Sequence, residues 1–144
     1  MTALEIRIEA GADPGKVALC HVDGEVIDME YCSEIVKRGA YLSFDSFNHE
    51  QCIPKMYQHL YGGNAGTDGQ RIKAVKYILD KGYVKHVLLS QDTCHKTLLH
   101  KYGGYGYDHL ITNITPLMLD EGVTREQIYE MFVANPARWL DTSV

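Results

Sequence analysis

The chain has 144 residues, of which 45% are hydrophobic and 23% are charged, with a formal net charge of -5 and a pI of about 5.7. These values are typical of one folded domain with a moderate core, and the absence of any Lys/Arg run excludes nucleic acid and anionic membrane as expected partners. No apolar stretch reaches the roughly 18 residues of a membrane span, and the N-terminal segment lacks a signal-peptide pattern, so we expect a cytoplasmic protein.

The first third of the chain predicts a helix, a strand and a second helix. Ala3–Glu9 has the pattern of the end of a helix, and the apolar run Lys16–His21 predicts a short strand. Apolar residues at helical spacing predict a helix over Ile27–Arg38. Asp28 is placed to cap this helix, and Gly39 fits the position just past its end.

The middle of the chain repeats this alternation. Ala40–Phe44 predicts a second strand that ends at Asp45. Asn48–Thr67 is polar and becomes rich in glycine, so it predicts a long loop. Helical spacing returns over Asp68–Lys81, and Gly82 follows it at a position suited to a helix end.

The last part predicts a third strand over His86–Ser90, followed by two closing helices at Asn113–Glu121 and Thr124–Ala134. Thr124 and a glutamine three residues later form a capping-box pattern, and Pro136 is predicted to end the second helix. Short apolar strands that alternate with helices indicate parallel strands covered by helices, which is an α/β architecture.

Polar side chains follow each predicted strand. His21 and Asp23 come after the first strand, Asp45 after the second and Asp92 after the third. Ligands of parallel α/β folds gather at the carboxyl ends of the strands, and imidazole with carboxylate is a suitable set for zinc or another divalent ion. Taken alone, these residues predict either a metal site or an acid/base site at this rim.

The four cysteines form no C-x-x-C pair, which argues against a zinc knuckle or a redox dithiol. We therefore expect free thiols that pack or lie at the surface. His95, His100 and His109 lack ligand spacing on a regular element, and we expect them to be loop residues. We expect the remaining histidines other than His21 to be surface or structural residues: His49, His59 and His86.

Several longer segments resemble the C-terminal part of the phosphotriesterase family of the amidohydrolase superfamily, in the order and spacing of that family. They are DPGKVALCHVDG (13–24), RGAYLSFDSF (38–47), VLLSQDTCHKTLLHKYGGYGYDHL (87–110) and the closing NPARWL (135–140). The resemblance implies the last three βα units, strands six to eight, of a metal-dependent hydrolase (β/α)8 TIM barrel, with residues 1–144 as a single partial barrel domain.

The same resemblance implies a two-metal centre, most simply of zinc, that hydrolyses a small-molecule ester, lactone or organophosphate. His21 matches the family's metal ligand on the sixth strand. Asp92 matches the eighth-strand aspartate, which binds metal and takes a proton from the attacking water. The loop that follows Asp92 is then expected to wall the substrate pocket.

Other residues near this rim have two interpretations each. Asp23 either orients His21 or turns the chain, and Asp45 is expected to be a structural hydrogen-bond acceptor. Ser46 stands where relatives often place a substrate-contacting His or Arg. The aromatic residues of the loop either line a pocket or pack beneath it: Tyr102, Tyr105 and Tyr107.

The resemblance also implies that several metal ligands are missing. A complete barrel of this type takes about 250 residues, and no H-x-H occurs in this chain. The bridging lysine and the fifth-strand histidine of the family have no counterpart either. We therefore expect a self-associating chain or one that pairs with the missing barrel half. Three origins stay open: a truncated gene model, half of a split enzyme, or a catalytically inactive remnant that persists as an interaction module.

Overall fold

The computed structural model describes residues 2–23, 28–49 and 66–141 of the chain. Within these residues three parallel strands form one sheet in the order β1-β2-β3, with bounds β1 Ala18–Leu19, β2 Tyr41–Phe47 and β3 Val87–Gln91. The registers pair Leu19 with Leu42, and Leu42 with Val87. The predicted α/β class with parallel strands is therefore confirmed.

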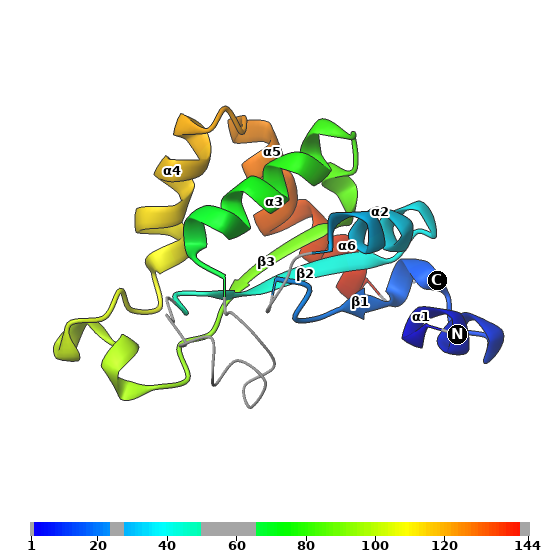
Figure 1. Cartoon of the computed structure of the whole chain (residues 1–144), viewed down its shortest axis with the longest axis horizontal. Helices are drawn as coiled ribbons and strands as arrows, with labels where there is room; N and C mark the ends of the chain where they lie inside the picture. The colour runs from blue at the N-terminus through cyan, green and yellow to red at the C-terminus, as the bar shows by residue number, and fades with distance from the viewer. Residues whose placement is uncertain (1, 24–27, 50–65, 142–144) are drawn as a thin grey trace.

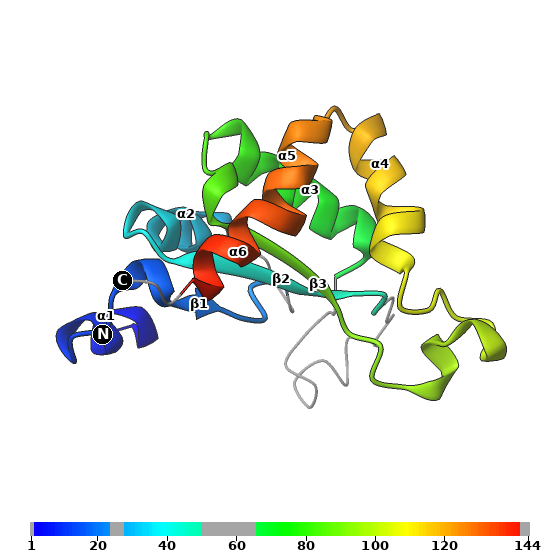
Figure 2. The ribbon, with the colours of Figure 1, turned by 180° about the vertical axis from the view of Figure 1, so that it is seen from behind.

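The helices cover one face of this sheet (Figures 1 and 2). The helix α1 spans Ala3–Glu9, α2 spans Met29–Lys37 and α3 spans Asp68–Asp80. The closing helices are α4 Thr115–Asp120, α5 Arg125–Tyr129 and α6 Asn135–Leu140. No helix in the described parts of the chain is both long and apolar enough to traverse a bilayer.

The hydrophobic core lies between the sheet and these helices. The central strand β2 contributes Leu42, Phe44 and Phe47, which are fully buried. Helix α3 contributes Val75 and Ile78, and the closing helices contribute mainly isoleucine and methionine side chains. Burial of this one continuous apolar layer is the main force that holds the strands in place beneath the candidate site.

Local sequence signals set the helix boundaries. The Asp28 carboxylate accepts from the backbone N–H groups of Glu30 and Tyr31, as predicted for the cap of α2. The Thr124 capping box is also present, and α1 has one of its own at Thr2, so this segment is a complete short helix. Gly39 adopts φ 89°, a left-handed conformation that glycine accepts at little cost.

Two predicted boundaries were wrong, and a third prediction could not be compared with the structure. Strand β2 continues to Phe47, so Asp45 and Ser46 lie inside the strand instead of after it. The penultimate helical segment begins at Leu110, earlier than predicted, because a π turn over Leu110–Ile114 precedes α4. The predicted loop Asn48–Thr67 falls mostly on residues 50–65, which lie outside the described part of the chain.

Pro136 does not end the last helix, contrary to prediction. A π turn over Glu130–Ala134 joins α5 directly to α6, and Pro136 lies in the first turn of α6. Proline lacks an N–H group and fits best where the regular i to i−4 ladder is interrupted. The helix therefore continues to Leu140.

The family-like ending NPARWL fastens this helix to the sheet. Asn135 is fully buried, and its side-chain amide donates hydrogen bonds to the carbonyl oxygens of Val84 (2.8 Å) and Val87 (2.7 Å). The side-chain oxygen Oδ1 of Asn135 accepts a hydrogen bond from Arg138 Nη1 at 2.8 Å. These bonds fix the start of β3, and hence the strand that carries Asp92 at its far end.

Candidate functional site

The carboxyl ends of the three strands form the rim at which the candidate residues meet. His21 follows β1, Asp45 lies near the end of β2, and Asp92 follows β3. The Asp92 backbone N–H donates to the Phe47 carbonyl at 3.0 Å, so the chain remains paired with β2 at this point. The loop from Thr93 to Tyr107 then extends away from the body of the molecule (Figure 1).

His21 is held by Asp45. The backbone N–H of His21 donates to both carboxylate oxygens of Asp45, at 3.1 and 3.2 Å, and the His21 Nδ1 atom lies 3.0 Å from Asp45 Oδ1. The predicted role of Asp45 as a hydrogen-bond acceptor is confirmed. Because Asp45 occupies Nδ1 and the imidazole is 82% exposed, the Nε2 atom is free to meet a ligand from the solvent side.

Asp23 does not orient His21, so this interpretation was wrong. Its carboxylate is completely buried and accepts from the Ser46 backbone N–H (2.9 Å) and the Ser46 hydroxyl (3.1 Å). Burial raises the pKa of Asp23, an effect that the hydrogen bonds from Ser46 and the charge of Arg71 oppose in part. Both Asp23 and Ser46 thus serve the structure beneath the rim.

A buried charge network lies under the rim and was not predicted. Arg71 is fully buried between Asp23, whose Oδ2 lies 3.4 Å from its Nε, and Asp68, whose Oδ1 lies 2.9 Å from its Nη1. The other Asp68 oxygen lies 2.7 Å from His109 Nε2, and His109 is 3% exposed. His109 is therefore a buried member of this network and not the loop residue that we expected.

The sequence indicates this network only by two charged residues that fall on the buried face of α3. Asp68 and Arg71 are three residues apart and Arg71 immediately precedes Ile72, the first core residue of α3. Such a pair is indistinguishable in sequence from an exposed helical ion pair, because the partners that bury it come from distant segments.

Asp92 contacts a residue that sequence reasoning set aside. His49 Nε2 lies 3.4 Å from Asp92 Oδ2 and 3.4 Å from Cys94 Sγ. None of the interactions described for His21 joins it to Asp92; its partner is Asp45. A clue to His49 was available, since it follows Asp45 by four residues and therefore stands at the same rim.

The tyrosines of the loop are mostly exposed, with Tyr107 at 75%, so they do not pack beneath the loop, and their position in a pocket stays a prediction. Tyr105 is the exception in one respect, because its ring stacks on the buried His109 ring with centroids 4.6 Å apart. Among these residues, only Tyr105 is thus tied to the layer under the rim by a ring contact.

The three cysteines in the described part of the chain divide into exposed and buried thiols, which makes a direct test possible. Cys20 and Cys94 are exposed, whereas Cys32 is buried in the core and desolvation raises the pKa of its thiol to about 11. Because the thiolate is the reactive form, brief alkylation near pH 8 should modify Cys20 and Cys94 but spare Cys32 until the protein is denatured. Peptide mass spectrometry measures each rate, and equal labelling of Cys32 and Cys20 would contradict the described packing of α2.

Comparisons with known proteins support the family resemblance of the sequence segments. The sequence profile of the Phosphotriesterase family matches residues 1–140. The N-acetyltaurine hydrolase of Danio rerio is 34% identical over 137 residues, which are 95% of this chain and 38% of that protein. The phosphotriesterase-related protein of Drosophila melanogaster is 39% identical with the same coverage. The chain thus spans about two fifths of the length of these relatives.

Solved structures agree with the fold. A resiniferatoxin-binding protein from Rhodobacter sphaeroides superposes with a TM-score of 0.86 at 29% identity, over 98% of this chain and 38% of that one. The phosphotriesterase homology protein from Escherichia coli, solved with phosphate in its active site, gives 0.77 at 25% identity, over 96% and 43%. The three βα units are therefore an α/β portion of a TIM barrel of this type. The chain belongs to the phosphotriesterase family.

Proposed function

We propose that this chain forms part of a metal-dependent hydrolase of ester, lactone or phosphotriester bonds. The observation that carries the proposal is the position of Asp92, a half-exposed carboxylate directly after β3 at the rim where TIM barrels bind their substrates. The family assignment supports the reaction class, because members of this family are generally binuclear metal hydrolases.

The residues present fit a divalent cation, with zinc as our choice. His21 has an exposed imidazole whose Nδ1 is held by a carboxylate, the arrangement common to metal-binding histidines. Asp92 supplies a carboxylate oxygen, and both are ordinary zinc ligands. A bound cation would lower the pKa of a water molecule and polarise the carbonyl or phosphoryl group.

Each residue then has one task. Asp45 fixes the His21 ring and leaves Nε2 for the metal. Asp92 accepts the proton of the attacking water and passes it to the leaving group or to bulk solvent. His21 and Asp92 are two ligands, fewer than the three that catalytic zinc sites draw from a protein, so the proposal includes pairing of this chain with the rest of a barrel or with a second copy.

Asp92→Asn tests the proposal. The amide keeps the shape of the side chain but loses the negative charge and the ability to accept a proton. We expect hydrolysis of nitrophenyl esters, lactones and nitrophenyl phosphotriesters by zinc-loaded protein to fall by at least about 100-fold. Asp80→Asn is the matched control, because this exposed carboxylate pairs with Lys76 at the end of α3.

Equal turnover by Asp92→Asn and the wild-type protein would refute the role of Asp92. A wild-type protein without turnover on any substrate, together with a stable oligomer free of metal, would favour the alternative of a non-catalytic module. That alternative has one observation in its favour: in the described residues β1 and β3 each pair with β2 alone, which leaves both sheet edges open to another strand.

A further inference from the structure

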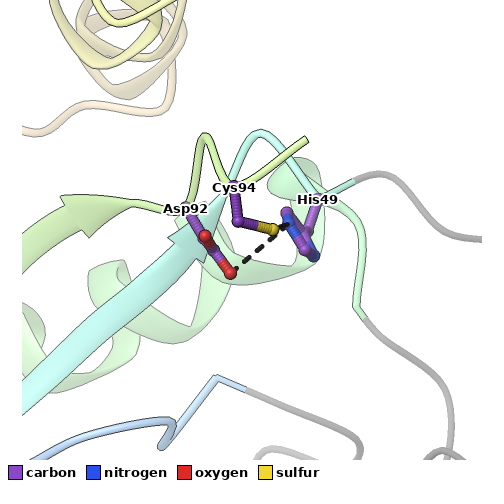
Figure 3. A group of neighbouring side chains, drawn as sticks. All are labelled: His49, Asp92 and Cys94. Carbon is purple, nitrogen blue, oxygen red and sulfur yellow. Dashed lines mark hydrogen bonds and ion pairs between the residues drawn. The ribbon is translucent and has the colours of Figure 1, made fainter. Parts of the chain in front are cut away.

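Three side chains at the rim converge on one point in a way that the family assignment does not explain. His49, Asp92 and Cys94 come from the segments that follow β2 and β3, and their side chains point toward one another (Figure 3). One ligand atom from each lies within 4.8 Å of the other two. The His49 imidazole is 16% exposed, whereas Asp92 and Cys94 are open to solvent.

The separations fit a metal site. The 3.4 Å between His49 Nε2 and Asp92 Oδ2 is long for a hydrogen bond between nitrogen and oxygen. Tetrahedral zinc, with bonds of about 2.0–2.1 Å to nitrogen and oxygen and 2.3 Å to sulfur, separates its nitrogen and oxygen ligands by about 3.3 Å and its nitrogen and sulfur ligands by about 3.6 Å. The two pairs that include His49, both at 3.4 Å, lie within about 0.2 Å of these edges, and the ligand atoms of Asp92 and Cys94 lie within 4.8 Å of each other.

The two segments that carry these ligands are fastened to each other and to the core. The Asn48 side-chain amide donates to the hydroxyl of Thr93, the residue between Asp92 and Cys94, at 3.3 Å. The Asn48 backbone N–H donates to the Asp68 carboxylate, and buried Arg71 donates to the His49 carbonyl at 3.2 Å. Asn48 adopts a left-handed backbone with φ 76°, a conformation that asparagine accepts more readily than most residues, and this turn presents His49.

We propose that His49 Nε2, the Asp92 carboxylate and Cys94 Sγ form a three-ligand site for a divalent cation of borderline softness such as zinc. Imidazole and thiolate select such ions over magnesium or calcium, and three protein ligands leave the fourth tetrahedral position to water or a substrate oxygen. This set lies within one chain and shares Asp92 with the His21 arrangement. It rests on geometry alone and does not require that the chain hydrolyses anything.

Cobalt titration of the full chain tests the site, because cobalt(II) replaces zinc and bonded thiolate gives it an intense near-ultraviolet charge-transfer absorption. We expect this absorption to saturate at one equivalent and to be removed by excess zinc. Cys94→Ser should abolish it and His49→Ala should weaken it. Zinc affinity, measured by competition with a chromophoric chelator, should fall by at least about 10–100-fold in both variants. This is the loss known for partners that only hydrogen-bond to a metal ligand, and removal of the ligand itself should cost no less.

Two matched controls make the result specific. Cys20→Ser removes the other described exposed thiol, which lies beside Asp45, and His21→Ala removes the ligand that the family resemblance implies. Both should keep the cobalt absorption. In the wild-type protein, zinc should slow alkylation of Cys94 and leave that of Cys20 unchanged.

Two outcomes would overturn the site: no thiolate absorption in the wild-type protein, or absorption that survives Cys94→Ser, above all where it is lost in Cys20→Ser. Without thiolate absorption in the wild-type protein, the three side chains would form only a hydrogen-bonded surface group. Absorption that depends on Cys20 would place the cation near His21. Because none of these measurements uses turnover, their failure is separate from failure of the proposed hydrolase activity.

Discussion

Replacement of Arg71 by alanine is expected to lower the free energy of unfolding by about 3–5 kcal/mol, the usual cost of removing one partner from a buried ion pair. The guanidinium group is 0% exposed and lies between the carboxylates of Asp23 and Asp68, which are 0% and 5% exposed. Without it, Asp23 keeps only the hydrogen bonds from Ser46 to balance a charge with no access to water.

The loss should depend on pH in a defined direction. Burial already raises the pKa of Asp23, and Arg71 opposes that rise, so removal of Arg71 raises the pKa further. A carboxyl group whose pKa is higher in the folded than in the unfolded state makes the folded state bind more protons, so stability falls as pH rises between the two values. The deficit of Arg71→Ala should therefore be smaller toward about pH 4–5 than at neutral pH.

Urea denaturation followed by circular dichroism at both pH values measures this effect. Arg38→Ala is the control, because its ion pair with Glu5 joins two partly exposed side chains and is expected to contribute little to stability. If Arg71→Ala were no less stable than Arg38→Ala at neutral pH, the buried network would not hold the rim together.

Replacement of Phe44 by alanine is expected to cost about 3–5 kcal/mol. Phe44 is fully buried on the central strand and faces the helices as part of the continuous apolar core. Phe44 pairs with Leu89 of β3, and nearby Leu42 pairs with both neighbouring strands, so the strand resists movement into the cavity that alanine would leave.

Phe44→Leu is the matched control, because leucine fills most of the same volume and should cost less than about half as much. Chemical denaturation provides the comparison, with an unchanged m-value as evidence that both variants remain folded in the same way. Equal losses for the two variants would mean that the site repacks freely and that this core is looser than the burial indicates.

The features predicted from sequence are those set by neighbouring residues. Asp28 and Thr124 cap their helices through residues two or three positions away, and Gly39 ends a helix by its own backbone freedom. The parallel strands and the placement of Asp45 and Asp92 at one rim also followed from the alternating pattern. Such signals are local, so they survive in a single sequence.

The features that were missed depend on contacts between distant segments. Asp23 was open to two interpretations, and only the approach of Ser46 and Arg71 decides between them. His49 was not predicted as a site residue. The direction of its side chain depends on the left-handed turn at Asn48, which the Asp68 carboxylate of α3 supports. Pro136 was predicted to end the helix because proline usually interrupts an α-helix. That rule does not hold where a π turn precedes the proline.

That π turn makes the end of the chain sensitive to changes in length. An α-helix rotates by about 100° per residue, and a π turn already holds one extra residue in its wider turn. Deletion of one residue from Glu130–Ala134 would therefore restore regular pairing with little rotation, whereas an insertion would turn everything after it by about 100°. After an insertion Asn135 would face away from the carbonyl oxygens of Val84 and Val87, and the helix would lose its attachment to the strand before Asp92. A single deletion in Glu130–Ala134 should accordingly be tolerated more readily than a single insertion, although the segment touches no ligand of the candidate site.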